Sequence, residues 1–163
     1  MAQHSFSVDI AEMKIAHSPD CLYSLALGSC IGVAIFDPIA GIGGLIHVLL
    51  PSFSGFDITT HSRKKFADSG INDLVNEMVI NGASRLRMRA KMAGGATMFL
   101  NQNGFPGGSI GERNIESGRL TLKRLGIQLI AQDVGGNKGR TIYFDIQTGS
   151  LRIKMSDKQE KTI

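Results

Sequence analysis

Tryptophan is absent from this chain of 163 residues, and aromatic residues are few, with eight Phe and two Tyr. Proteins that bind single-stranded nucleic acids commonly stack the bases on a platform of aromatic side chains. The formal net charge of +4 alone would allow a nucleic-acid partner. The shortage of aromatic residues argues against one, so no nucleic-acid partner is predicted.

Long apolar runs are also missing. None approaches the roughly 20 residues that a membrane-spanning helix needs. The N-terminal segment MAQHSFSVDIAEMKIAHSPD lacks the basic start and continuous apolar core of a signal peptide. We therefore expect a cytoplasmic protein that does not insert into a membrane.

Cysteine is scarce too, and the two residues present, Cys21 and Cys30, form neither a CxxC motif nor a zinc-binding spacing. In the cytoplasm both would be free thiols. His17 lies four residues before Cys21, but Pro19 between them disfavours the helix that would bring the two together. No metal site is predicted.

The composition, with 42% apolar and 20% charged residues, is typical of a folded globular protein. Residues 1–155 are expected to form a single domain, and residues 156–163, SDKQEKTI, a polar tail. In residues 85–92, RLRMRAKM, basic and apolar residues alternate. This pattern predicts a half-buried strand whose basic face lies in solvent or meets an acidic partner.

Periodicity and turn signals predict the remaining elements. We expect two helices, at 63–81 and 111–125, separated by the strand at 85–92 and a loop at 93–108. A loop rich in Ser, Gly and Thr is expected at 51–62. The other strands are expected at 6–15, 22–37, 44–50, 127–133, 140–146 and 150–155. The fold class is therefore mixed α/β (α+β), with helices packed on a sheet.

The stretch LALGSCIGVAIFDP, residues 25–38, places Cys30 before an apolar run, and GLIHVLL, residues 44–50, places His47 in another. The Asp37-Pro38 turn between them predicts an antiparallel hairpin. If facing residue numbers sum to 77, Cys30 faces His47. If they sum to 79, His47 is the diagonal neighbour on the same face. Only an even sum separates the two residues.

This pair would suit nucleophilic catalysis. A free thiol has a pKa near about 8.5, and a neighbouring histidine can accept its proton. Gly28 would let a substrate approach the backbone, and amides near Ser29 and Cys30 could bind an oxyanion. The alternatives are an inert buried thiol for Cys30 and a core histidine with satisfied nitrogens for His47. Cys21 is interpreted as structural.

Two further patterns resemble functional motifs but also have purely structural interpretations. GSCIG, residues 28–32, fits the G-x-nucleophile-x-G elbow of α/β-hydrolases, but the elbow needs a helix after the nucleophile and IGVAIF is strand-like. The Gly-rich pieces AGGA, from residue 93, and GGNKGR, from residue 135, could form anion-binding nests. Tight turns are the favoured interpretation of both.

These residues resemble a known family, the chemoreceptor glutamine deamidases called CheD. The similarity begins with LGSC, the apolar strand, DP and GLIHVLLP. It continues in order through KFADSGINDLVNEM, AKMAGGATMF, IGERNIE, LGIQLIAQDVGGNKGR and TGSLRI. It covers about residues 20 to 155, nearly the whole chain.

The resemblance implies catalytic roles for Cys30 as nucleophile and His47 as acid and base. The family has a threonine six residues before its cysteine, and here that position is Ser24. Serine keeps the hydroxyl but loses the methyl that stiffens χ1. The implied enzyme is a protein-glutamine glutaminase, a cysteine-dependent amidohydrolase without metal or organic cofactor.

The resemblance also implies a three-layer α/β sandwich. Its implied substrates are glutamines on the cytoplasmic helices of methyl-accepting chemotaxis receptors, and a CheC-type phosphatase is an implied partner. The competing hypothesis is a non-catalytic module that docks on receptors or on such a phosphatase. Deamidation of a receptor fragment that depends on Cys30 would separate the two.

Overall fold

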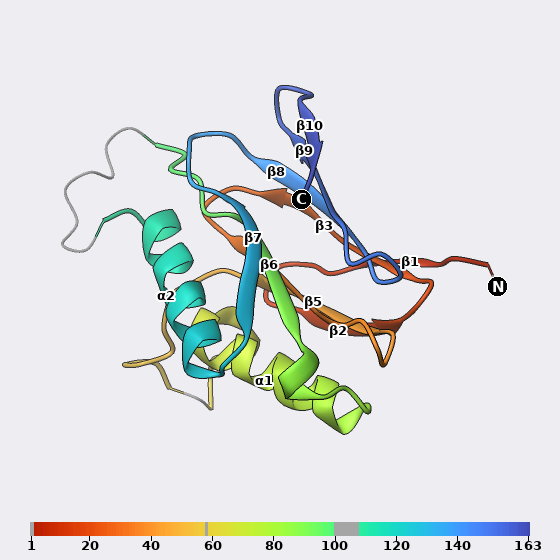
Figure 1. Ribbon diagram of the computed structural model, residues 1–163. Coiled ribbons are helices and arrows are strands. Elements are labelled where there is room, and N and C mark those ends of the chain that lie inside the picture. The colour runs from red at the N-terminus through yellow and green to blue at the C-terminus, as the bar shows by residue number, and fades with distance from the viewer. Residues whose placement is uncertain (1, 58, 100–107) are drawn as a thin grey trace.

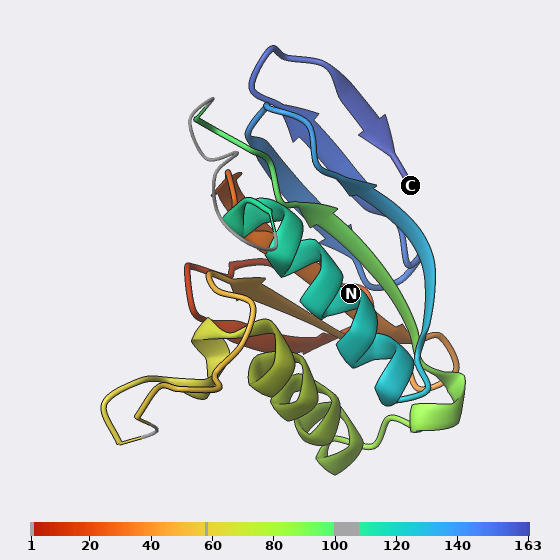
Figure 2. The same ribbon diagram turned by 90° about the vertical axis from the view of Figure 1, so that its left-hand side faces the viewer.

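The computed structural model describes residues 2–57, 59–99 and 108–163, and has two five-stranded sheets and two α-helices in three layers. One sheet, here the inner sheet, lies between the helices and the other, the outer sheet (Figure 1). The helices cover the face of the inner sheet that Figure 2 turns toward the viewer. This confirms the predicted mixed α+β class and the three-layer sandwich.

Both sheets are mixed and mainly antiparallel. The order of the inner sheet is β2-β5-β4-β6-β7, and only β6 and β7 run parallel. Its strands are β2 (Met13–His17), β4 (Ile31–Asp37), β5 (Ile42–Val48), β6 (Arg89–Gly94) and β7 (Gln128–Val134).

The order of the outer sheet is β1-β3-β8-β9-β10, and only β1 and β3 run parallel. Its strands are β1 (Ser5–Ser7), β3 (Cys21–Leu27), β8 (Arg140–Asp145), β9 (Leu151–Met155) and β10 (Glu160–Thr162).

The helices are α1 (Ala67–Ile80) and α2 (Ile110–Arg124). Ser109 caps α2 through a capping box, because its hydroxyl accepts from the Glu112 amide while the Glu112 carboxylate accepts from the Ser109 amide. The sequence predicted one helix over 63–81. The structure instead has a 3-10 turn, η1 (Arg63–Lys65), then extended Phe66, and α1 begins at Ala67.

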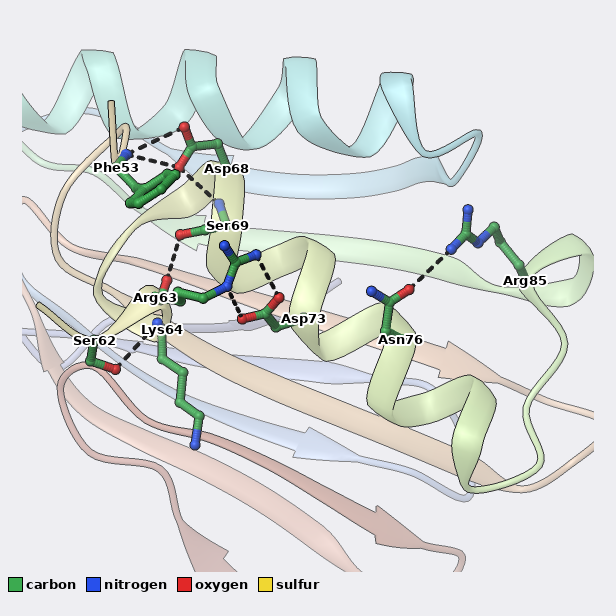
Figure 3. Close-up of polar contacts among 9 residues, drawn as sticks. All are labelled: Phe53, Ser62, Arg63, Lys64, Asp68, Ser69, Asp73, Asn76 and Arg85. Carbon is green, nitrogen blue, oxygen red and sulfur yellow. Dashed lines mark hydrogen bonds and ion pairs between the residues drawn. The ribbon is translucent and has the colours of Figure 1, made fainter. Parts of the chain in front are cut away.

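Polar contacts fasten the segment before α1 to the helix itself (Figure 3). Arg63 donates two hydrogen bonds of 2.8 Å to the carboxylate of Asp73, and Ser69 donates to the Arg63 carbonyl. At the start of the helix, the carboxylate of Asp68 accepts from the backbone amide of Phe53 at 3.0 Å. These contacts fix the segment between β5 and α1 against the start of the helix.

Every residue of β4 and β5 is buried, because both faces of the inner sheet are covered. Along a strand the side chains alternate between faces. In β4, Ile31, Val33 and Ile35 pack toward the helices, whereas Ala34 and Phe36 pack toward the outer sheet. The strict alternation that marks a one-sided strand is therefore absent from this part of the sequence.

The single strand predicted over 22–37 was wrong. The chain forms β3 in the outer sheet, crosses at Gly28, Ser29 and Cys30, and continues as β4 in the inner sheet. A bulge between Ser24 and Leu27 bends β3 before the crossing, and Ala26 has a positive φ of 55° there. Both strands are apolar, so the sequence shows no boundary between them.

The strand predicted over 85–92 was wrong in its first half. Residues 85–87 form a 3-10 turn, η2 (Arg85–Arg87), and β6 begins at Arg89. Arg87 pairs with the buried carboxylate of Asp37 at 2.7 Å, which fixes this turn. Most of the loop predicted over 93–108 lies outside the described residues.

The C-terminal segment differs from the expected tail. Residues 156–163 are mostly exposed and polar, but Glu160–Thr162 pairs with β9 as the edge strand β10. Ile163 packs against the core between the sheets. Among the helices that the structure describes, none is both long enough and apolar enough to span a bilayer.

Candidate functional site

The hairpin of β4 and β5 has the second of the two registers considered from the sequence. Ile31 faces Val48 and Gly32 faces His47, so facing residue numbers sum to 79. Cys30 directly precedes β4 and lies two positions from Gly32. Cys30 and His47 therefore lie diagonally, on the face of the inner sheet that packs against the outer sheet.

Ser24 reaches this site from the outer sheet. Its Oγ lies 2.7 Å from the carbonyl oxygen of Val8 and 2.7 Å from Nδ1 of His47. A hydroxyl has one hydrogen and a carbonyl can only accept, so Ser24 donates to Val8. His47 must then donate from Nδ1 to Ser24 Oγ. This chain of hydrogen bonds leaves Nε2 of the neutral ring as the free base.

Nε2 of His47 is buried and has no hydrogen-bond partner among the described residues. The side chain is only 2% exposed. Burial lowers the pKa of His47 from its ordinary value, against the opposing effects of the Val8 carbonyl and the Asp9 charge. The imidazole is therefore neutral at physiological pH, with its lone pair available.

Cys30 is 8% exposed. Burial raises the pKa of its thiol, and a hydrogen bond from its own backbone amide opposes that rise. The resting pair is thus a neutral thiol and a neutral imidazole.

The crossing turn that carries Cys30 is held by its carbonyl groups. The carbonyl of Gly28 accepts from the Ala96 amide at 2.9 Å, and that of Cys30 accepts from the Gly95 amide at 2.8 Å. The carbonyl of Ser29 accepts from the side-chain amide of Asn114 at 2.9 Å. The turn is therefore fixed against the segment after β6 and against α2.

Two surface hollows flank the site. One, of about 390 Å³, is lined by His47 together with Val8, Asp9, Ile10 and Leu25. The other, of about 410 Å³, contains Gly28 in its wall, and Leu25 lines it as well. Leu25 is 54% exposed, since it follows the buried Ser24 on the outward face of β3. Surface access is thus open to both sides of Leu25.

The Gly-rich segments that could have been anion nests contact each other. The amide of Gly135 donates to the Gly94 carbonyl at 2.9 Å, and Thr97 donates to the Gly136 carbonyl. The guanidinium of Arg140 donates to the carbonyls of Gly94 and Gly135. These contacts favour turns that support the Cys30 segment.

Two groups that contact the site residues were not identified from the sequence. The Val8 carbonyl is a backbone group with no signature, and Asn114 stands in a helix more than 80 residues from Cys30. Apolar neighbours on one side of Asn114 were the available signal. Residues 2–57, 59–99 and 108–163 contain no group of three or more His, Cys, Asp or Glu placed to hold a metal ion.

A three-layer fold with a cysteine and a histidine on one sheet face, and a hydroxyl holding the histidine, defines a candidate thiol-dependent site. The family model described as CheD chemotactic sensory transduction matches residues 49–155. The chain belongs to the CheD family. The matched range begins after His47, so relatives of full length carry the comparison across the site.

Two such relatives match nearly the whole chain. A probable chemoreceptor glutamine deamidase CheD of Desulfitobacterium hafniense is 44% identical over 161 residues, covering 96% of this chain and 97% of the relative. A probable chemoreceptor glutamine deamidase CheD 1 of Methanosarcina acetivorans is 45% identical over 156 residues, covering 96% and 95%.

A solved structure shares the fold at low sequence similarity. It is a Neisseria meningitidis protein of the DUF152 family, with a TM-score of 0.51 and 10% identity. The match covers 82% of this chain and 64% of that one. At this identity the likeness establishes the fold alone.

Proposed function

We propose that this protein deamidates glutamine side chains of chemotaxis receptors to glutamate, with Cys30 as nucleophile and His47 as acid and base. The observation that carries the proposal is the tautomer of His47. Its Nδ1–H is engaged by Ser24, which leaves a free Nε2 on the sheet face that Cys30 shares. Orientation of a base by a third group is the logic of a catalytic triad.

In the first step, Cys30 Sγ attacks the carboxamide carbon while its proton passes to His47 Nε2. The tetrahedral intermediate collapses as His47 returns that proton to the leaving nitrogen, and ammonia departs. A thioester remains on Cys30. Water, deprotonated by His47, then adds to the thioester carbon, and the thiol and a glutamate are released.

The oxyanion of each tetrahedral intermediate would be bound by backbone amides of the crossing turn. The Cys30 amide, which lowers the pKa of the thiol, is the first candidate donor. The Ser29 amide is the second candidate donor, and Gly28 lets the substrate approach. One such donor typically contributes about 3 kcal/mol to the transition state.

The substrate assignment rests on the names of the relatives, which are probable chemoreceptor glutamine deamidases. The target glutamines would lie on the cytoplasmic helices of methyl-accepting receptors, where the new carboxylate can itself be methylated. The protein would act in the cytoplasm, without cofactor, and a CheC-type phosphatase would be a further partner. The alternative is a non-catalytic module docking on the same proteins.

Ammonia release from a purified cytoplasmic receptor fragment tests the proposal. Cys30→Ala should abolish release, and His47→Ala should lower it by at least 100-fold, within the range of general acid–base catalysis. Cys21→Ala is the matched control, since this half-buried thiol lies at the start of β3. It should retain wild-type activity. Deamidation that persists in Cys30→Ala would overturn the role of Cys30, and no deamidation by the wild type would support the non-catalytic module.

Alkylation by iodoacetamide gives a second readout that needs no receptor. His47→Ala should slow labelling of Cys30 and leave that of Cys21 unchanged, because only Cys30 shares a sheet face with the imidazole. Peptide mass spectrometry measures both rates in one sample. Equal slowing of both cysteines would point to a general change in the fold.

A further inference from the structure

We infer that Asn114 is a positioning residue for the oxyanion hole, an inference that rests on the proposed function. Asn114 lies on α2 and is fully buried. Its Nδ2 donates to the carbonyl of Ser29 at 2.9 Å and to that of Leu49 at 3.1 Å. Ser29 precedes Cys30 and Leu49 lies two residues after His47, so one side chain joins the two segments of the site.

The orientation of the amide follows from its neighbours. Both atoms near the end of the side chain are carbonyl oxygens, which can only accept, so the NH₂ group must face them. Its two hydrogens suit two acceptors. An aspartate has no donor when ionised, and the backbone amides of α2 are used within the helix. The side-chain amide of Asn114 can therefore hold both carbonyls, whereas an ionised aspartate at this position could hold neither.

The effect on the site follows from peptide geometry. A peptide bond is planar and trans, so the C=O of Ser29 and the N–H of Cys30 point in opposite directions. By holding the Ser29 oxygen against α2, Asn114 turns the Cys30 N–H away from the helix. No backbone carbonyl of the described residues accepts from that N–H, so it can donate to the oxyanion that forms on the substrate. The carbonyl of Gly28, held by Ala96, fixes the Ser29 N–H in the same way.

Three consecutive carbonyls, those of Gly28, Ser29 and Cys30, are thus held by the protein, while neither the Ser29 nor the Cys30 amide donates to another backbone carbonyl in the described part of the chain. Two of these carbonyls accept from backbone amides, and that of Ser29 accepts from the side chain of Asn114. Its own Oδ1 is buried without a partner among the described residues. A buried unpaired oxygen is unfavourable, so the two hydrogen bonds of the NH₂ group must offset that cost.

The test separates the oxyanion hole from the nucleophile. Deamidation forms an oxyanion, whereas iodoacetamide alkylates sulfur by displacement at carbon and forms none. Asn114→Ala should therefore lower kcat on the receptor fragment by about 10- to 100-fold, approaching the loss of one donor. KM and the Cys30-to-Cys21 labelling ratio should stay within twofold of wild type. His47→Ala, in contrast, should lower both kcat and the labelling ratio.

Ser117→Ala is the matched control on the same helix, because Ser117 donates to the Pro51 carbonyl at 2.5 Å, away from the Cys30 turn. It should keep wild-type kcat. If Asn114→Ala melts below the assay temperature, Asn114→Ser, which leaves a smaller cavity, replaces it. Equal kcat in the Asn114 and Ser117 variants would overturn the inference, as would a parallel fall in kcat and labelling, or failure of both Asn114 variants to fold. Loss of activity in Cys30→Ala would still support the proposed function in each case.

Discussion

Ser24 Oγ and His47 Nδ1 lie 2.7 Å apart across the interface between the two sheets. The same hydroxyl donates a hydrogen bond to the Val8 carbonyl, also at 2.7 Å. Neither Ser24 nor His47 has appreciable exposed surface. The imidazole is therefore oriented from the outer sheet, although it belongs to the inner one.

Ser24→Thr should keep deamidation, because it preserves the hydroxyl that accepts from His47. Ser24→Ala should slow turnover about fivefold, which corresponds to a helper hydrogen bond of about 1 kcal/mol at the transition state. Ammonia release measures turnover, with thermal melting as the control for folding. Full activity in Ser24→Ala would leave Cys30 and His47 as a dyad.

The pH dependence of kcat/KM should show an acidic limb that belongs to His47. Burial lowers the pKa of this residue from 6.5, so the neutral base persists to more acidic pH than in a free histidine. The midpoint of this acidic limb should therefore lie below pH 6.5. A limb centred above 6.5 would contradict the burial and tautomer described here.

Gly32→Ala should destabilise the contact between the sheets opposite His47. A Cβ at this position would lie 2.4 Å from Cδ1 of Ile142 and 3.3 Å from Cδ1 of Leu27. Overpacking of this kind costs about 1–3 kcal/mol. Ile142→Val removes the closer atom, so the double variant should be more stable than the two single effects predict. Urea unfolding of all four proteins measures this coupling, and simple additivity would argue against the clash.

Asp37 should make stability dependent on acid pH. The carboxylate is buried, which raises its pKa, but Arg87 and the amides of Ser84, Ala40 and Ile39 outweigh this and hold the pKa well below the usual range. A lowered pKa gives stability that is present above about pH 4 and lost as the pH falls.

Asp37→Asn should therefore lower stability at pH 7 by about 2 kcal/mol, the range of hydrogen bonds to charged groups. Its deficit relative to wild type should shrink as the pH is lowered toward 3. Melting temperatures at several pH values measure it. A deficit that stays constant with pH would show that packing, and not charge, is responsible.

The amino-acid sequence predicted the fold class, the two helices and the antiparallel hairpin, because turn residues and amphipathic helix periodicity are local signals. It also narrowed the relation of Cys30 to His47 to two registers, both on one face. It did not show that β3 and β4 belong to different sheets. Both strands are apolar, and β4 is covered on both faces, so neither alternation nor polarity marks the crossing at Gly28–Cys30.

The site itself was only partly predictable for a similar reason. Cys30, His47 and Ser24 are side chains in a recognisable motif, and their roles stay predictions here. The contact of Ser24 with His47 depends on the stacking of two sheets, and that of Asn114 with Ser29 on the packing of a helix. Such contacts join residues distant in sequence, and local patterns do not show which of these residues meet.

The three groups around Cys30 come from three separate layers: Ser24 from the outer sheet, His47 from the inner sheet and Asn114 from α2. The chain therefore has no smaller unit that contains a complete site. A fragment or a permuted chain that leaves one layer undocked would lose an orienting contact even if the other two layers remained folded. Turnover therefore depends on correct packing of all three layers. A partner that separated the layers slightly would lower turnover without contacting the thiol.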